Sequence, residues 1–338
     1  MSFLEGLDNC KVLVVGDIMV DSFVYGCGKR LSQEAPVPVV LVKKKFYKLG
    51  GAGNVAANLV ALGCRTDICG FVGKDITSRI CRDLMRSTGI STDYLVESMH
   101  PTILKTRVIA DNQHVVRFDE EESFSESLVE RLSDVDPQHY NAVIISDYAK
   151  GTIQQSVMDL ISDRFRDKFV IVDPKPKNHN LYKNVNSITP NLAEARMMTN
   201  CEDAINCAKY LQEELNCDFV IVTLSEHGVF MYNKGKSTQL PAYPISTSDL
   251  SRRDVTGAGD TLIAAFVAFH CAGMDCARSL VLANIAAAIA VTKIGTEVCS
   301  LDELREELSH EEKMASYFGR VDRSDVDSSV EGNFHSRI

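Results

Sequence analysis

The stretch that decides the fold is "AVIISDYAKGTIQQSVMDLISDRFRDKFVIVD", residues 142–173. It begins and ends with apolar runs, "AVIIS" (142–146) and "FVIVD" (169–173), and the helical pattern "SVMDLISDRFRD" (156–167) lies between them. An apolar strand, a helix and a second apolar strand are typical of a β-α-β unit, whose two strands are parallel and buried on both faces. We therefore predict a parallel sheet covered by helices.

The same alternation continues outside this stretch. Further apolar runs with strand character are "KVLVVG" (11–16), "NSIT" (186–189) and "FVIVT" (219–223). Helical patterns follow at "GNVAANLVALG" (53–63) and "NLAEARMMTN" (191–200), where we expect Met197 and Met198 to face the core. The pattern predicts an α/β fold, a three-layer sandwich with a mostly parallel central sheet.

Two segments depart from this rhythm, about 18–48 and about 100–120. The first contains "APVPVVLVKKKFYKL", and the second alternates polar and apolar residues on both sides of a turn at Asp111-Asn112. Proline and alternation are typical of edge strands, so we predict a small antiparallel sheet beside the main layer. Residues 311–338 are polar and poor in aliphatic side chains, which predicts a weakly ordered tail after a domain at 1–310.

Composition excludes some classes of protein. The net charge is −10, which argues against nucleic acid or anionic lipid as the main partner, although a local basic pocket is compatible with it. The eleven cysteines are irregularly spaced and form no CxxC pair, which is typical of reduced thiols in the cytoplasm. No apolar run reaches the roughly 18–20 residues of a membrane span, and the start lacks a secretory signal pattern.

Polar residues follow the predicted strands at equivalent positions: Asp17, Asp147, Asp173, Asn191 and Thr223. In an open parallel sheet the ligand crevice lies outside the carboxyl ends of the strands. Any one of these residues could instead cap a helix or form a turn. Their recurrence at five strand ends favours a binding site.

The segment "TGAGD" (256–260) opens a long apolar helix pattern. Because Gly257, Ala258 and Gly259 have almost no side chain, an anion can approach the backbone N–H groups at the helix start, as in a phosphate cradle. Asp260 could simply stabilise the helix N-terminus. It could also be a general base that takes a proton from an attacking hydroxyl, which is the chemistry that phosphoryl transfer requires.

A second glycine cluster lies in "KLGGAGNVAANLVALG" (48–63). Gly50 and Gly51 precede a helix that carries Asn54, and glycines beside an amide suit a polyhydroxylated ligand or a phosphate. Loop glycines can also be simple turn residues. Neither a GxxxxGK[ST] loop nor a kinase-type GxGxxG loop occurs, so a nucleotide site here must be of another type.

The segments "DVTGAGD" (254–260) and "GGAGNVAANLVALG" (50–63) resemble the two signatures of ribokinase-like sugar kinases, over about residues 10–300. Within that family the chain is most similar to kinases that act on heptose 7-phosphate in ADP-heptose synthesis. The stretches that carry this similarity are "GDIMVDSFVYG" (16–26), "RLSQEAPVPVV" (30–40), "HPTILKTRVIADNQHVVRFDEEE" (100–122), "SDYAKG" (146–151), "VDPK" (172–175) and "TPNLAE" (189–194). Many bacterial members carry a second enzyme domain, whereas we expect this chain to be the stand-alone kinase form.

The resemblance implies an ATP-dependent enzyme that uses Mg²⁺ and phosphorylates the C1 hydroxyl of D-glycero-D-manno-heptose 7-phosphate, a precursor of the lipopolysaccharide core. It implies that Asp260 is the base and that the anion hole is formed by Gly257, Ala258 and Gly259. Sugar-binding positions would be Asp21, Gly50, Gly51 and Asn54. Nucleotide-binding positions would be Asn191, Glu194, Thr223, Ser225, Gly228 and Asn284. Glu194 would also order Mg²⁺ through water, and a monovalent cation such as K⁺ would bind near Asp254 and Thr256, with carbonyls near Ala290 and Gly295.

The phosphate of such a substrate needs cations, and the chain offers several candidates: Lys105, Arg107, Arg117, Lys150 and Lys175, with Asp147 also at the substrate. Basic residues on an edge strand can instead serve to prevent aggregation. "EEES" (120–123) is predicted to be a solvated acidic turn. The inserted sheet would be the family's β lid, through which a homodimer is expected.

Two alternatives stay open. The same machinery could act on another sugar, sugar phosphate or nucleoside. A catalytically silent sugar-binding regulator is the other, although the intact Asp260 and both glycine clusters argue against it.

Overall fold

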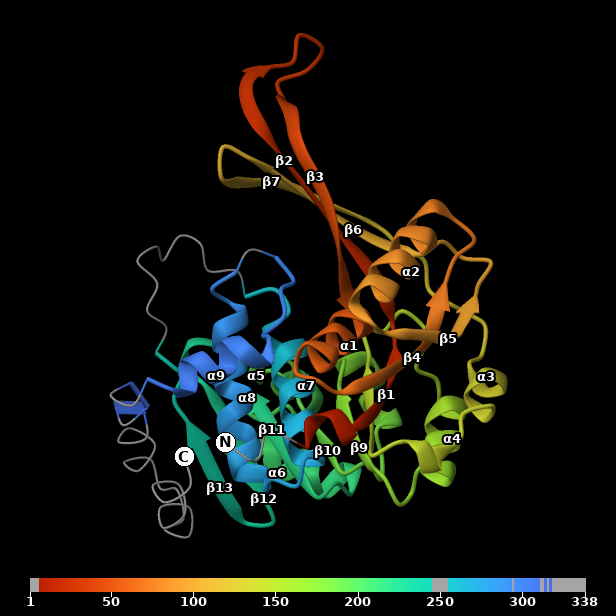
Figure 1. Cartoon of the computed structure of the whole chain (residues 1–338), viewed down its shortest axis with the longest axis vertical. Helices are drawn as coiled ribbons and strands as arrows, with labels where there is room; N and C mark the ends of the chain where they lie inside the picture. The colour runs from red at the N-terminus through yellow and green to blue at the C-terminus, as the bar shows by residue number, and fades with distance from the viewer. Residues whose placement is uncertain (1–5, 245–254, 294, 311–312, 315, 318–338) are drawn as a thin grey trace.

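The computed structural model describes residues 6–244, 255–293, 295–310, 313–314 and 316–317 (Figure 1). Its main sheet has the strand order β13-β12-β11-β10-β9-β8-β1-β4-β5. All neighbours in this order are parallel except the β11–β12 and β12–β13 pairs. The strands are β1 (Lys11–Gly16), β4 (Arg65–Val72), β5 (Ser91–Glu97), β8 (Ala142–Ser146), β9 (Phe169–Asp173), β10 (Ser187–Ile188), β11 (Phe219–Thr223), β12 (Val229–Asn233) and β13 (Lys236–Leu240).

Helices cover both faces of this sheet, because successive side chains of β1 pack alternately into two apolar clusters, one on each face. Val12 and Val14 pack into one apolar cluster, with α1 (Ala52–Ala61), α2 (Ile76–Thr88), α7 (Ala258–Cys271), α8 (Cys276–Ala290) and α9 (Leu301–Leu308). Leu13 and Val15 pack into the other, with α3 (Val129–Ser133), α4 (Gln155–Arg164), α5 (Leu192–Thr199) and α6 (Ala204–Leu215). The predicted three-layer sandwich is therefore confirmed. Short 3₁₀ turns lie at Leu7–Asn9, Pro137–His139, Pro176–Leu181 and Ser225–His227.

Side-chain caps fix where several helices begin. Asn191 accepts a hydrogen bond from the N–H of Glu194, whose carboxylate accepts from the N–H of Asn191, a reciprocal capping box at the start of α5. Ser300 and Glu303 form the same arrangement at α9. These caps satisfy backbone donors that have no partner within the helix, so both helices start at defined residues.

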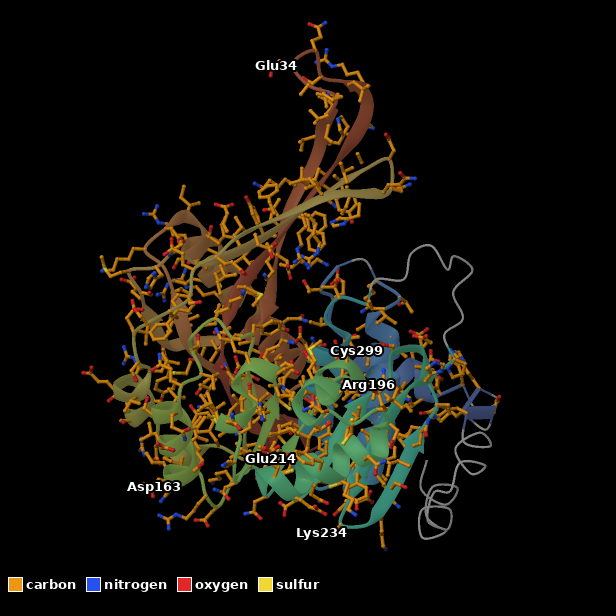
Figure 2. The ribbon with its side chains drawn as sticks, turned by 180° about the vertical axis from the view of Figure 1, so that it is seen from behind. Glu34, Asp163, Arg196, Glu214, Lys234 and Cys299 are labelled. Atoms are coloured by element: carbon orange, nitrogen blue, oxygen red, sulfur yellow. The ribbon has the colours of Figure 1, made fainter. Side chains whose placement is uncertain are left out.

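A second sheet forms the lid and projects from the body as an arm (Figure 1). Its order is β3-β2-β6-β7, from β2 (Ile18–Leu31), β3 (Pro38–Gly51), β6 (Ile103–Ala110) and β7 (Gln113–Glu120). Glu34, in the β2–β3 connection, lies at the far end of this arm in Figure 2. The predicted turn at Asp111 and Asn112 is confirmed, with φ of 50° and 64°.

The lid sheet is mixed, whereas the sequence predicted an antiparallel one. β2 pairs with β6 in parallel, because the chain passes through β4 and β5 of the main sheet before it re-enters the lid in the same direction. Only Asp17 separates β1 from β2, and β3 ends at Gly51 directly before α1. The lid is therefore attached at the carboxyl edge of the main sheet.

The tail predicted at 311–338 falls mostly outside the described residues. Of those that are described, Met314 and Tyr317 are buried. The ring of Tyr317 packs edge-on against Tyr243, with 5.0 Å between ring centroids. The chain thus keeps contact with the body as far as Tyr317.

Across the part of the chain that the structure describes, no helix has both the length and the hydropathy needed to cross a membrane. The eleven cysteines are all free thiols, and most of them are buried.

One predicted core pair is only half buried. Met198 is 6% exposed and packs against the α5–α6 side of the sheet, but Met197 is 70% exposed. The prediction for Met197 was wrong because the buried face of α5 passes through Ala195, Met198 and Thr199, and Met197 lies about 100° away from Met198, on the exposed side.

This pair makes a matched stability test. We expect Met198→Ala to lower the free energy of unfolding by about 2–4 kcal/mol, because it leaves a cavity in the core. Met197→Ala should change it by less than about 0.5 kcal/mol. Urea denaturation of the two variants checks the prediction, and equal losses would contradict the assigned helix face.

Candidate active site

The site lies where neighbouring strands end at the carboxyl edge of the main sheet. Backbone hydrogen bonds link these ends in sequence: the N–H of Asp17 donates to Ser146 (3.0 Å), and that of Asp147 donates to Asp173 (3.1 Å). Farther along the edge, Asn191 and Thr223 form a parallel bridge. The sheet therefore brings together the five polar strand ends that the sequence predicted as a site.

Asp260 is a buried carboxylate at this edge, held by hydrogen bonds to both of its oxygens. It is 4% exposed and lies in the first turn of α7. Asn54 donates to its Oδ2 (2.7 Å), and the hydroxyl of Tyr148 donates to its Oδ1 (2.8 Å). Burial raises the pKa of Asp260 to about 6, while the hydrogen bonds from Asn54 and Tyr148 oppose that rise. The group is therefore ionised near neutral pH and suited to accept a proton.

The glycines before Asp260 serve two different purposes. Gly257 has φ of +83°, and a Cβ there would lie 2.6 Å from Nδ2 of Asn54, so a side chain would displace the asparagine. A Cβ on Gly259 would meet nothing within 4 Å, so the space beside its backbone is open. The N–H of Ala258 already donates to the carbonyl of Val255 (3.2 Å). Among the three residues predicted to form the anion hole, the backbone N–H of Ala258 is thus already hydrogen-bonded within the turn before α7.

The two glycines predicted at a sugar site, Gly50 and Gly51, are explained by close packing at the root of the lid. A Cβ on Gly50 would lie 2.7 Å from Oδ2 of Asp21, and one on Gly51, which has φ of +55°, would lie 2.5 Å from the carbonyl of Asp17. Asp21 is 3% exposed and accepts hydrogen bonds from the Arg107 guanidinium and from Oγ1 of Thr296 (3.4 Å). The structure thus brings Asp21, Gly50 and Arg107 together.

Asp17 and Asp147 have supporting positions. Asp17 is fully buried and accepts the N–H groups of Tyr148 (2.7 Å), Lys150 (3.1 Å) and Thr152 (3.3 Å). Asp147 is equally buried, and its donors are the Ala149 N–H (2.6 Å), Tyr182 hydroxyl (2.6 Å) and Asn178 amide (2.8 Å). The prediction that Asp147 contacts the substrate is not supported, because its carboxylate has no exposed surface. Both residues hold the loop after β8.

Every basic residue predicted at the substrate phosphate is paired with a carboxylate. Lys105 lies 2.9 Å from both Asp119 and Glu121, and Lys150 pairs with the second oxygen of Glu121. The segment 120–123 is exposed, as the sequence predicted, and within it Glu121 bridges the two lysines. The remaining pairs are Arg107 with Asp21, Arg117 with Asp119 and Lys175 with Glu194.

The predicted nucleotide residues lie farther along the same edge. The N–H of Thr223 donates to Pro190 (3.0 Å), which places Thr223 beside the Asn191–Glu194 cap. Ser225 is exposed with φ of +53°, and a Cβ on Gly228 would lie 2.1 Å from the carbonyl of Leu240. These three residues thus form one tight turn after β11, at the amino end of α5.

Asn284 was predicted to bind the nucleotide, but in the structure its amide group contacts other parts of the protein. It is 7% exposed, and its amide nitrogen donates to the carbonyl of Pro241 (2.8 Å) and to the hydroxyl of Tyr317 (2.7 Å). The donor side of this amide is therefore occupied within the protein. Its observed role is to hold the irregular segment that follows β13, at Pro241, and the chain at Tyr317 against α8.

The carboxylates described at this edge could bind a metal ion through water molecules, but they do not form a direct coordination site. Within the described residues no three His, Cys, Asp or Glu side chains are grouped to hold a metal ion. Glu194 has one oxygen paired with Lys175 and the other on the N–H of Asn191 (3.0 Å). Such a carboxylate fits Mg²⁺ held by phosphates and water. Asp254, predicted for a monovalent cation, lies outside the described residues, and Thr256 immediately precedes Gly257.

Sequence reasoning missed the roles of Tyr148 and Glu121. Tyr148 stands in "SDYAKG", two residues past β8, and that position at a strand end was the available signal. Glu121 offered no comparable signal, because the three acidic residues 120–122 look alike in the sequence.

Solved structures share this architecture. Ribokinase from Thermotoga maritima has a TM-score of 0.69 at 20% identity and matches 89% of this chain and 99% of its own. Phosphofructokinase-2 from Escherichia coli, solved in complex with substrates and products, has a TM-score of 0.72 at 16% identity and matches 93% of this chain and 100% of its own.

Closer similarity is found in sequence. The bifunctional protein HldE of Hahella chejuensis is 38% identical over 317 residues, which cover 91% of this chain and 65% of that protein. HldE of Campylobacter curvus is 35% identical over 308 residues, with coverage of 88% and 64%. The chain thus spans about two thirds or slightly less of the length of these relatives. The family model described as pfkB family carbohydrate kinase matches residues 9–303, and the chain therefore belongs to this family of ATP-using phosphotransferases.

Proposed function

We propose that this protein transfers a phosphoryl group from ATP to the C1 hydroxyl of D-glycero-D-manno-heptose 7-phosphate, giving the 1,7-bisphosphate. The observation that carries the proposal is the buried Asp260, with a pKa raised to about 6, at a helix start with open backbone beside Gly259. The similarity to HldE proteins over about nine tenths of the chain supports heptose 7-phosphate as the acceptor.

In this mechanism Asp260 accepts the proton of the sugar hydroxyl as that oxygen attacks the terminal phosphorus of ATP. Asn54 and Tyr148 hold the carboxylate, so that it does not have to reorient during the reaction. The N–H groups at the start of α7 and the positive end of its dipole stabilise the negative charge on the transferred group. Lys175, which lies close enough to Asp260 to lower its pKa, adds a positive charge near the reacting groups.

Nucleotide binding is assigned to the turn after β11 and to the start of α5. Thr223, Ser225 and Gly228 line the first of these, and Asn191 and Glu194 the second. Glu194 would order Mg²⁺ through water. When bound to the phosphates of ATP, Mg²⁺ supplies positive charge that offsets the charge of the transferred group. A K⁺ requirement through Thr256 and Asp254 is part of the proposal.

The substrate phosphate is assigned to Lys105 and Lys150. Their ammonium groups reach the two oxygens of the same carboxylate, Glu121, so they are close enough together to bind one phosphate between them. Glu121 would move aside when the phosphate binds. Arg107, held by Asp21 on the neighbouring strand, supports the sugar end of the same surface.

A homodimer through the lid is also proposed. β3 and β7 are the edge strands of the lid sheet, and both expose large apolar side chains: Leu41 and Val42 on β3, and Val116 and Phe118 on β7. Unpaired edges with apolar surface favour a second copy of the chain. A cytoplasmic location fits the use of ATP and the free cysteines.

The proposed reaction is tested by ADP release with a panel of acceptors: heptose 7-phosphate, fructose 6-phosphate, ribose, fructose and adenosine. We expect turnover with heptose 7-phosphate and little with the unphosphorylated sugars. Asp260→Asn should lower kcat by a factor of roughly 10²–10⁴, because it removes the base, while the protein still binds both substrates. Turnover of another acceptor alone would overturn the assigned sugar, and an active Asp260→Asn protein would overturn the mechanism.

The phosphate assignment is tested with Lys105→Met. We expect the KM for the sugar phosphate to rise about tenfold or more and the KM for ATP to stay within about twofold, because a charge-assisted contact to one substrate is lost. Lys209→Met, in an exposed position on α6, is the control and should change neither constant. An equal rise in both KM values would place Lys105 outside the sugar-phosphate site.

The dimer is tested by sedimentation velocity. The wild-type protein should sediment as a dimer, and Phe118→Asp should shift it toward the monomer, because a charge on the lid edge is costly to bury. Met197→Asp adds the same charge on an exposed helix position of the body and should leave the dimer intact. A wild-type monomer at all concentrations would exclude this interface.

A further inference from the structure

We propose that Tyr148 is the positioning residue of Asp260, and that its hydroxyl fixes the orientation of the carboxylate and keeps it ready to accept a proton. This inference rests on the proposed role of Asp260 as the base. It does not depend on which sugar is the acceptor.

Each oxygen of Asp260 has its own donor. The hydroxyl of Tyr148 lies 2.8 Å from Oδ1, and the amide nitrogen of Asn54 lies 2.7 Å from Oδ2. Two donors on different oxygens fix the plane of the carboxylate, which a single donor cannot do. An ionised carboxylate has about four acceptor positions, so both oxygens keep room for a substrate hydroxyl.

Tyr148 is itself held from two directions. Its backbone N–H donates to Oδ2 of Asp17 (2.7 Å), a carboxylate with no exposed surface. The ammonium group of Lys175 lies 5.2 Å from the centre of its ring and pairs at the same time with Glu194. A ring fixed at its backbone and across its face can place the hydroxyl accurately, which is the requirement for a supporting residue.

The charges around this pair come from several elements. Asp21 on β2 raises the pKa of Asp260, whereas Lys175, after β9, lowers it. Asp173 at the end of β9 is close enough to Asp260 for its own pKa to be raised by burial and by that neighbour. Arg107 pairs with Asp21 and so reduces its effect. Against this mainly acidic background, a neutral donor stabilises the ionised form of Asp260 without adding charge.

The phenol of Tyr148 remains a donor across the working pH range. Burial and the carboxylates of Asp260 and Asp173 raise its pKa well above that of an ordinary tyrosine, so it stays protonated. A hydrogen bond to the charged form of a carboxyl lowers the pKa of that carboxyl. Loss of the hydroxyl should therefore raise the pKa of Asp260 and protonate the base at higher pH.

Tyr148→Phe tests this, because it keeps the ring under Lys175 and removes only the hydroxyl. We expect the acid limb of the kcat/KM profile to move to higher pH by about half to one unit, as for the loss of one charge-assisted hydrogen bond. At about pH 7 this shift should lower kcat by up to about twofold through protonation of Asp260, on top of the loss caused by poorer positioning of the carboxylate. The protonation part of the loss should disappear at about pH 9, where Asp260 is ionised in both proteins, whereas the positioning part should remain. A purely structural role would lower activity without moving the acid limb.

Tyr140→Phe is the matched control. Tyr140 donates its hydroxyl to the buried carboxylate of Asp67 and lies outside the site, so this variant also loses one tyrosine–aspartate hydrogen bond. It should lower stability and leave the acid limb unchanged.

A second measurement does not need turnover. Carboxyl ¹³C NMR, with Asp260→Asn used to assign the signal, should show a higher pKa for Asp260 in Tyr148→Phe than in the wild type. Equal pKa values in the two proteins together with an unmoved acid limb would overturn the inference, as would a Tyr148→Phe enzyme faster than the wild type. If no acceptor is turned over at all, the proposed function fails, and the NMR titration alone then decides the role of Tyr148.

Discussion

The hydrogen bond between Asn54 and Asp260 is the contact on which the site depends. It ties the first turn of α1, which begins where the lid strand β3 ends, to the first turn of α7. The two glycine clusters flank this bond, and Gly257 has no side chain because a Cβ would lie within 2.6 Å of the amide of Asn54. A movement of the lid root would therefore be transmitted directly to Asp260, the proposed base.

This arrangement has a cost in stability. When folding raises the pKa of a group, the contribution of that group to stability is fully present at pH values below its pKa in the unfolded chain. The contribution is lost as the pH rises through its pKa in the folded protein. For Asp260 the ordinary value is 3.8 and the folded value about 6, so the loss is complete only above about pH 6. At neutral pH the buried charge thus costs about 3 kcal/mol, the equivalent of the roughly two-unit shift. Asp260 therefore lowers the stability of the fold most in the pH range where it is ionised and able to accept a proton.

Much of the fold could be predicted from the sequence, and candidate site residues could be proposed from it, because both depend on local patterns. β1, β8, β9 and β11 lie at the predicted residues, since continuous apolar runs bounded by polar residues are typical of buried parallel strands. Asp260 and the glycines before it stood out as site candidates because backbone approach to an anion requires small residues at a helix start. Even the turn at Asp111 and Asn112 was visible, since both residue types tolerate positive φ.

The polar partners could not be predicted, because they join residues far apart in the chain. Nothing near Tyr148 indicates that its hydroxyl meets a carboxylate 112 residues later, or that Glu121 lies between Lys105 and Lys150. For the same reason the surroundings of Asp147 could not be predicted: it accepts hydrogen bonds from Ala149, Asn178 and Tyr182, and the last two belong to the segment after β9. The position of a polar residue at a strand end therefore predicts that it lies in the region of the site. Whether its side chain faces a ligand or supports a neighbouring loop depends on its hydrogen-bond partners, which the sequence does not reveal.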